Sequence, residues 1–131
     1  MKKMIFFLSL AISLTPPVWA YSAEKGPVKI AVASTGETTT ASVSNLAARS
    51  PYYLIFDGTG KLIAVLSNPY KDVARGAGPS AANFLAAKSV TIVIAENFGA
   101  KMINILKGKL IRCVEFQGHV DEAVRKVVEV K

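Results

Sequence analysis

The sequence predicts a single α/β domain with a mixed five-stranded sheet, in the order β-β-β-α-β-α-β-α, flanked by helices. In the first half, apolar runs are joined by a Gly-Thr-Gly turn, which is typical of an antiparallel hairpin. In the second half, short apolar runs alternate with amphipathic segments, which is typical of parallel strands joined by helices. A chain of 131 residues has room for one such domain.

Three strands are expected in the first half. "VKIAVAS", residues 28–34, is almost continuously apolar and is expected to be a buried strand. A long polar connection of small residues follows over 35–50. "PYYLIFD" (51–57) and "KLIAVLSN" (61–68) flank the Gly-Thr-Gly turn, and we expect them to pair as a hairpin.

The second half is expected to alternate helix and strand. Pro79 suits the first turn of a helix. "VTIVIAE", residues 90–96, is the most hydrophobic strand, and we expect it to be central because both of its faces must be covered. The helix "GAKMINILKG" is expected to stop with Gly108 at its C′ position. A strand over 110–116 and a helix over 120–130 complete the domain, 28–131.

Residues 1–20 have the pattern of a cleaved signal peptide. Lys2 and Lys3 precede an apolar run that reaches Leu14, and Val18-Trp19-Ala20 forms a small-x-Ala cleavage site. Cleavage after Ala23 is a less regular alternative. The apolar run is shorter than the roughly 20 residues of a spanning helix, so no stable membrane anchor is expected. We therefore predict an exported protein of the periplasm.

Charge and cysteine content narrow the possible partners. The formal net charge is +7 and falls to +5 without Lys2 and Lys3. The cations are spread along the chain without interleaved aromatics, which indicates a solvated surface and small anionic ligands, and not nucleic acid. Cys113 is the single cysteine, so an intrachain disulfide and a closed zinc site are both excluded.

Gly76, Gly78 and Ala81 match the G-x-G-x-x-A pattern of dinucleotide-binding proteins, with Glu96 twenty residues after Gly76. That fold needs the glycines directly after its first parallel strand. Here they follow a hairpin strand by about eight residues, so we exclude a nicotinamide or flavin site. No nucleophile–base pair or carboxylate pair is apparent either, and we predict that the protein is not an enzyme.

Loops that follow the predicted parallel strands are the candidate binding region. Such loops gather at one edge of an open α/β sheet and form the ligand crevice. Glycines let the backbone approach a ligand closely, amides at a helix start can hold an anion, and an arginine can balance its charge. The predicted binding residues are Ser34, Arg49, Arg75, Gly76, Gly78, Asn97 and Gly99.

Two further residues allow more than one interpretation. His119 is the only histidine, and it is either a metal ligand as neutral imidazole or an exposed residue ahead of the last helix. Cys113 is either a small buried hydrophobe or a thiol for a soft metal. Met102 belongs to an apolar helix stripe and is expected in the core.

Over residues 28–128 the chain resembles the NifX-like, dinitrogenase iron–molybdenum cofactor biosynthesis family. The resemblance follows the whole domain in order, and its strongest parts are the "GAG" before a helix and a strand–glycine–helix block. It implies a ribonuclease-H-like fold that binds an anionic metal–sulfur cluster without turnover. The stretches that carry it are "KIAVAS", "SPYYLIFD", "SNPYKDVARGAGPSAANFLAAKSV", "TIVIAENFGAKMINILKGKLI" and "HVDEAVRKVV".

The chain departs from the family in two respects. The family commonly has His-Phe-Gly ahead of its second strand, with a histidine proposed to touch the cluster, and this chain has Leu46-Ala47-Ala48 there. Nitrogenase cofactor assembly is cytoplasmic, whereas this chain carries an export pattern.

Nucleases of the same fold need an acidic residue on the first strand, and "VKIAVAS" has none, so nuclease activity is not expected.

These observations predict an exported, non-enzymatic binding protein. It would carry or buffer a metal, or an anionic molybdenum-, iron- or copper-containing sulfide cluster. The alternative is a periplasmic protein-interaction module whose cofactor site has decayed, with a partner that the sequence does not name. The two alternatives differ in whether the protein takes up a metal species.

Overall fold

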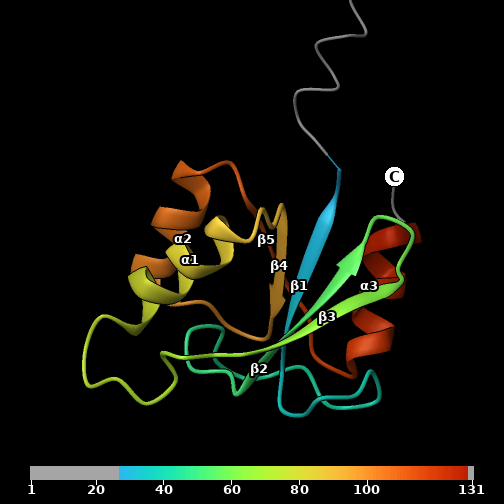
Figure 1. Ribbon diagram of the computed structural model, residues 1–131, viewed down its shortest axis with the longest axis horizontal. Helices are drawn as coiled ribbons and strands as arrows, with labels where there is room; N and C mark the ends of the chain where they lie inside the picture. The colour runs from blue at the N-terminus through green and yellow to red at the C-terminus, as the bar shows by residue number, and fades with distance from the viewer. Residues whose placement is uncertain (1–26, 130–131) are drawn as a thin grey trace, which may run out of the picture.

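The computed structural model describes residues 27–129, which form one five-stranded sheet with three helices (Figure 1). The predicted fold class, element order and ribonuclease-H-like arrangement are confirmed. The signal peptide predicted over 1–20 lies outside the described residues. The elements are β1 (Lys29–Ser34), β2 (Tyr52–Asp57), β3 (Leu62–Ser67), α1 (Ala77–Ala87), β4 (Ile92–Ala95), α2 (Ala100–Gly108), β5 (Arg112–Glu115) and α3 (Val120–Glu129).

The sheet has the order β3-β2-β1-β4-β5. β1 pairs with β2, and β2 with β3, in antiparallel register, whereas β1–β4 and β4–β5 are parallel pairs. The parallel strands therefore end together, at what we call the carboxyl end of the sheet, and each helix after them begins there. All three helices finish at the opposite, amino end, where the β2–β3 hairpin loop lies beside the end of α3 (Figure 1).

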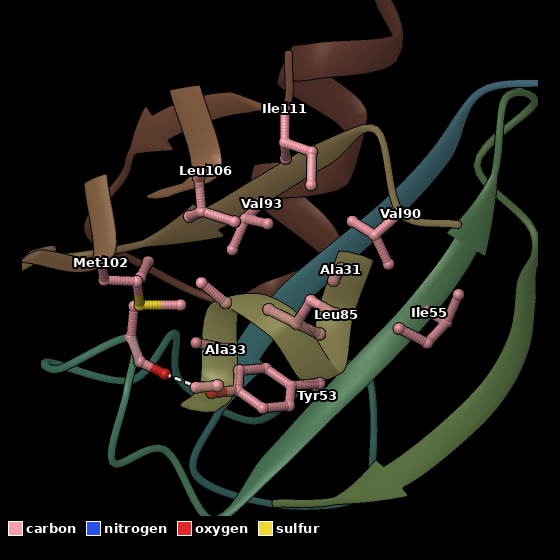
Figure 2. Packing of buried hydrophobic residues seen from close by; sticks show 14 residues of the cluster. Ala31, Ala33, Tyr53, Ile55, Leu85, Val90, Val93, Met102, Leu106 and Ile111 are labelled. Atoms are coloured by element: carbon pink, nitrogen blue, oxygen red, sulfur yellow. Dashed lines mark hydrogen bonds between the residues drawn. The ribbon is translucent and has the colours of Figure 1, made fainter. Parts of the chain in front are cut away.

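Two apolar cores hold the helices on opposite faces of the sheet. Helices α1 and α2 cover one face, where Leu85, Met102 and Leu106 pack on inward side chains such as Tyr53 and Val93 (Figure 2). Met102 is fully buried, as predicted. Helix α3 covers the other face with its own core, of which Val120, Ala123, Val124 and Val127 are the buried helical members.

The prediction of which strand is central was wrong. β1 occupies the middle of the sheet, and β4 lies beside it. Both are interior strands with helices on both faces, so both sequences are apolar for the same reason. Hydrophobicity alone does not distinguish two interior strands.

The predicted end of the second helix was also wrong. Gly108 is helical, Lys109 is the C-cap, and Leu110 takes the left-handed C′ position with φ of 62°. The amide of Leu110 donates to the Lys107 carbonyl oxygen (2.9 Å), and the amide of Ile111 donates to that of Leu106 (2.9 Å). These two bonds form a Schellman motif, in which glycine is the usual C′ residue.

The connection between β1 and β2 is fixed to its neighbours by isolated bridges. Ser34 pairs with Val43, Ser42 with His119, and Leu46 with Asn97.

No helix within residues 27–129 is long and apolar enough to cross a membrane.

Candidate anion pocket at two helix N-termini

A pocket of about 440 Å³ opens at the carboxyl end of the sheet, on the side covered by α1 and α2. Three short segments from distant parts of the sequence line it: the end of the 35–50 connection, the start of α1 and the start of α2. Its lining residues are Leu46, Ala47, Ala48, Arg49, Gly76, Ala77, Gly78, Pro79, Gly99, Ala100, Lys101 and Met102.

Helix α1 begins at the pocket with no side-chain cap. Gly76 is the N-cap in a left-handed conformation, with φ of 76° and ψ of 17°, and no side chain bonds to the first-turn amides. A left-handed N-cap favours glycine, because other residues are strained there. The first amides of the helix, on Ala77 and Gly78, are thus left for another acceptor. Pro79 at the third position has no amide to satisfy.

Helix α2 begins at the same pocket and is also uncapped. Gly99 is its N-cap in extended backbone, with φ of −75° and ψ of 155°, and no acidic residue occupies the first turn. Helix α3 shows the contrast. There the Glu122 carboxylate accepts a bond from the amide of His119 (2.9 Å), and Asp121 accepts one from the amide of Glu122 (2.8 Å). The two helix starts at the pocket lack these internal acceptors.

The two uncapped helices touch each other at Gly78 and Met102. A Cβ atom on Gly78 would stand 3.4 Å from both the Cβ and the backbone nitrogen of Met102. Gly78 therefore allows the start of α1 to approach the start of α2 closely. The sequence predicted a close approach at Gly78 to a ligand, and the structure shows a close approach to a neighbouring helix.

The third wall is the segment 46–50, which hydrogen bonds hold in place. The hydroxyl of Tyr53 donates to the Ala47 carbonyl oxygen at 2.6 Å, drawn as a dashed line in Figure 2. The buried Asn68 side chain donates to the carbonyl oxygens of Ala48 (2.8 Å) and Ser50 (2.9 Å). These bonds fix the wall before any ligand arrives, which lowers the entropic cost of binding. Burial also raises the pKa of Tyr53 above its ordinary value, so the hydroxyl stays protonated as a donor.

Arg49 and Lys101 are the charged residues of the lining, and both are exposed. Arg49 donates from one guanidinium nitrogen to the carbonyl oxygens of Lys71 (3.0 Å) and Val73 (2.8 Å). Its remaining donors are left for a ligand, since a guanidinium has five N–H groups. The lining holds no carboxylate, so the cations are not neutralised within it.

Lys101 was not predicted from the sequence, although one signal was present. It stands in the first turn of α2, where the helix dipole disfavours a cation and favours Asp or Glu. A lysine there would suit a helix start that meets an anion.

The structure brings together four of the predicted binding residues and places the other three apart. Arg49, Gly76, Gly78 and Gly99 line the pocket, and Arg75 is the exposed neighbour of Gly76. Ser34 and Asn97 do not line this pocket. The Ser34 hydroxyl is fully buried and donates to the Gly36 carbonyl oxygen (2.6 Å). Asn97 holds the wall, because its carbonyl oxygen accepts the amide of Ala47 (3.0 Å).

His119 lies away from the pocket, at the start of α3 on the opposite face of the sheet. Its ring nitrogen Nδ1 is 3.0 Å from the Thr40 carbonyl oxygen. Within residues 27–129 no three His, Cys, Asp or Glu side chains form a group that could hold a metal ion. Cys113 lies in β5, partly buried beside the α1–α2 core, as the hydrophobic interpretation expects.

A second hollow, of about 410 Å³, lies between α3 and the β2–β3 hairpin. Its charged residues are Asp121, Arg125 and Glu129, so carboxylates outnumber cations in it. It contains no helix start with free amides. The pocket at α1 and α2 is therefore the better match to an anion.

A family model described as dinitrogenase iron–molybdenum cofactor matches residues 28–130. The apo form of the orange protein from Desulfovibrio gigas has a similar fold, with a TM-score of 0.73 and 22% identity over 77% of this chain and 87% of that chain. A candidate NifB protein from Thermotoga has a TM-score of 0.68 and 30% identity over 79% of this chain and 89% of that chain. A search of curated proteins gives no match.

A candidate dinitrogenase from Methanocaldococcus jannaschii also has this fold, with a TM-score of 0.58 and 17% identity, covering 79% of this chain and 89% of that chain. The matched domain thus makes up nearly the whole of these solved proteins. With a family match over almost the entire described range, the chain belongs to the dinitrogenase iron–molybdenum cofactor family.

Proposed function

We propose that this protein is an exported carrier that binds an anionic metal–sulfur cluster as cargo, without turnover, at the pocket between α1 and α2. The observation that carries the proposal is the convergence of two uncapped helix N-termini on one pocket. Arg49 and Lys101 add two cations there, and no carboxylate lines the pocket.

A cluster with terminal sulfides suits this arrangement for electrostatic reasons. Each helix start carries about half a positive charge, and its free amides point at the ligand. The amides of Ala77, Gly78, Ala100 and Lys101 can donate to sulfides, and the spare donors of Arg49 can do the same. The remaining lining is apolar, including the half-exposed Leu46, and such a surface suits a large polarizable anion.

The donor set favours capture without coordination to the metal. No cysteine, histidine or carboxylate lines the pocket, and the thioether of Met102 is fully buried. Leu46, Ala47 and Ala48 occupy the positions of the family's His-Phe-Gly and supply no imidazole. A cluster held by amides and cations leaves without ligand exchange at the metal, which suits a carrier.

The comparisons support a metal-containing cargo, and they do not identify which metal this chain carries. The description of the matching family model names the iron–molybdenum cofactor, and one similar structure is that of a candidate NifB protein. The orange protein was solved in an apo form, a term used for a protein without its ligand. Molybdenum, iron and copper sulfides all remain candidates for this chain.

One observation favours the alternative, a protein-interaction module with a decayed cofactor site. Leu46 stands where the family has histidine, and 48% of its surface is exposed at the pocket mouth. An exposed leucine beside cations is also a feature of protein-binding surfaces. The two functions differ in whether the purified protein holds a metal.

Elemental analysis and absorption spectroscopy of untagged protein from its native periplasm would test the carrier proposal. We expect molybdenum, iron or copper near one equivalent, with a sulfide-to-metal charge-transfer band. A colourless protein that is free of metal, takes up no tetrathiomolybdate and purifies with a stoichiometric protein partner would contradict it. That result would support the interaction module.

A further inference from the structure

Leu110 stands out at the amino end of the sheet, opposite the pocket. It is 92% exposed, the most exposed large apolar side chain among the described residues. It also holds φ of 62°, a left-handed conformation that is unfavourable for any residue with a Cβ. Its side chain gains nothing from burial and its backbone is strained, so the stability of the fold does not account for a leucine here.

The end of α1 shows which kind of residue suits a left-handed C′ position when it serves only the stability of the helix end. Helix α1 ends with the same two-bond motif, in which the amides of Ser89 and Val90 donate to Ala86 and Leu85. The left-handed residue there is Ser89, with φ of 65°, and it is small and polar. The corresponding residue after α2 is the leucine. Leu110 is therefore a candidate for contact with something outside the chain.

The surface around Leu110 is strongly basic. Lys107 lies in the last turn of α2, Lys109 is its C-cap, and Arg112 begins β5. The described carboxylates of this end are Asp57, at the end of β2, and Glu129, at the end of α3. The described cations of the same end are Lys29, Lys61, Lys88, Lys107, Lys109, Arg112 and Lys126.

Helix C-termini favour cations, and this accounts in part for Lys88, Lys107 and Lys126. It does not account for the imbalance between the two ends of the sheet. At the carboxyl end, the described carboxylates (Glu37, Asp72, Glu96, Glu115, Asp121 and Glu122) outnumber the cations (Arg49, Lys71, Arg75 and Lys101). The positive charge of the described domain is therefore concentrated at the amino end of the sheet, and Lys107, Lys109 and Arg112 are the cations nearest to Leu110 in the chain.

The chain enters the fold at this same end. Val28, 46% exposed, directly precedes β1, whose first residue Lys29 donates from its ammonium to the Lys88 carbonyl oxygen (2.9 Å).

We propose that the amino end of the sheet is a docking surface for an anionic phospholipid bilayer. Lys107, Lys109 and Arg112 would meet lipid phosphates, and Leu110 would enter the interfacial layer between them. Basic residues near an anionic membrane attract it, and a single apolar side chain adds a short insertion. The pocket lies at the opposite end, so a docked protein keeps it open to solution.

Vesicle flotation tests this surface, using protein that begins at Tyr21 so that the leader does not contribute. Vesicles of equal parts phosphatidylethanolamine and phosphatidylglycerol are compared with vesicles of phosphatidylcholine alone. We expect binding to the anionic vesicles, release by salt and no binding to phosphatidylcholine. The double variant Lys107→Gln/Lys109→Gln should bind at least about tenfold more weakly, since each lysine near such a surface contributes about fivefold.

Leu110→Gly separates docking from folding. Glycine relieves the left-handed strain, so the melting temperature should rise, while vesicle affinity falls by about fivefold with the loss of the apolar side chain. The control Lys71→Gln/Arg75→Gln removes two cations from the carboxyl end and should bind vesicles as the unchanged protein does.

Three results would overturn the proposal: no binding to anionic vesicles, equal loss of binding in the control, or unchanged affinity in Leu110→Gly. Binding to polyglutamate without binding to anionic vesicles would also overturn it, and would identify an acidic protein as the partner.

Discussion

Gly78 of α1 and Met102 of α2 are in contact, and a Cβ atom on Gly78 would lie 3.4 Å from the backbone nitrogen of Met102. This contact sets the spacing of the two helix starts that form the pocket. A single ligand can reach both sets of free amides because the helices are this close. The positions of the amides, more than any one side chain, define the proposed site.

Substitution of Gly78 should therefore affect stability and binding together. Valine would push into the backbone of Met102, and we expect a loss of about 2 kcal/mol in the free energy of unfolding, as for other overpacked contacts. Cluster affinity should fall because the helix starts move apart. Urea unfolding and tetrathiomolybdate titration measure the two effects. Gly78→Ala adds one methyl group at 3.4 Å and is the mild control, so an equal loss in both variants would contradict this account.

Removal of the Tyr53 hydroxyl should loosen the wall of the pocket. The variant Tyr53→Phe leaves the carbonyl oxygen of the buried Ala47 without its 2.6 Å partner, at a cost of about 2 kcal/mol. Chemical unfolding monitored by circular dichroism would measure this. The variant Tyr70→Phe, at a half-buried tyrosine whose ring contacts Phe84, should keep the stability of the unchanged protein and serves as the comparison. If Tyr53→Phe is as stable as the unchanged protein, the hydrogen bond does not hold the wall.

The two cations of the pocket should have separable roles. Arg49 bonds the 69–75 loop as well as lining the pocket, whereas Lys101 only lines it. We expect Arg49→Gln to speed tryptic cleavage at Lys71 and Arg75 and to weaken anion binding. Lys101→Gln should weaken binding without changing the cleavage rate. Equal cleavage rates in the two variants would show that Arg49 does not fix the loop.

Cys113 should react slowly with thiol reagents in the folded protein, and its ionisation should lower the stability of the fold at alkaline pH. Burial raises its pKa, and the nearby Lys107 opposes this more weakly. The contribution of a thiol with a raised pKa to the unfolding free energy is fully present below its ordinary pKa of about 9. It is lost as the pH rises through the pKa of the thiol in the folded protein. The unfolding free energy should therefore fall above about pH 9, with less slope in Cys113→Val. Labelling by a disulfide reagent at neutral pH should speed up on unfolding, and equally fast labelling of the folded protein would contradict this.

The sequence predicted the fold well because the apolar periodicity of each element agrees with its place in the sheet. It did not predict the end of α2, since a leucine in the left-handed position contradicts the glycine rule on which the prediction rested. It also could not order the two interior strands, because β1 and β4 are both covered by helices on both faces and both are largely apolar for that reason.

The candidate site was predicted in part for a related reason. Glycines at helix starts are visible in a sequence, and Gly76 and Gly99 do line the pocket. The face of the sheet on which a loop lies depends on tertiary packing, so the sequence did not separate His119 from them. Ser34 was predicted from its place at the end of a strand, and its hydroxyl turned out to be bonded within its own loop.

The most direct test of the account is an anion titration of two variants at Gly99. A Cβ atom there meets nothing within 4 Å, and the backbone is already extended, so both variants should fold. Gly99→Asp places a carboxylate at the start of α2, where it caps the helix and repels an anion. Gly99→Asn places a neutral group of the same size there.

We expect tetrathiomolybdate affinity to fall at least about tenfold further in Gly99→Asp than in Gly99→Asn, with melting temperatures equal to or above that of the unchanged protein. Equal affinities in the two variants would show that the anion does not bind at the uncapped helix starts, and would contradict the central claim.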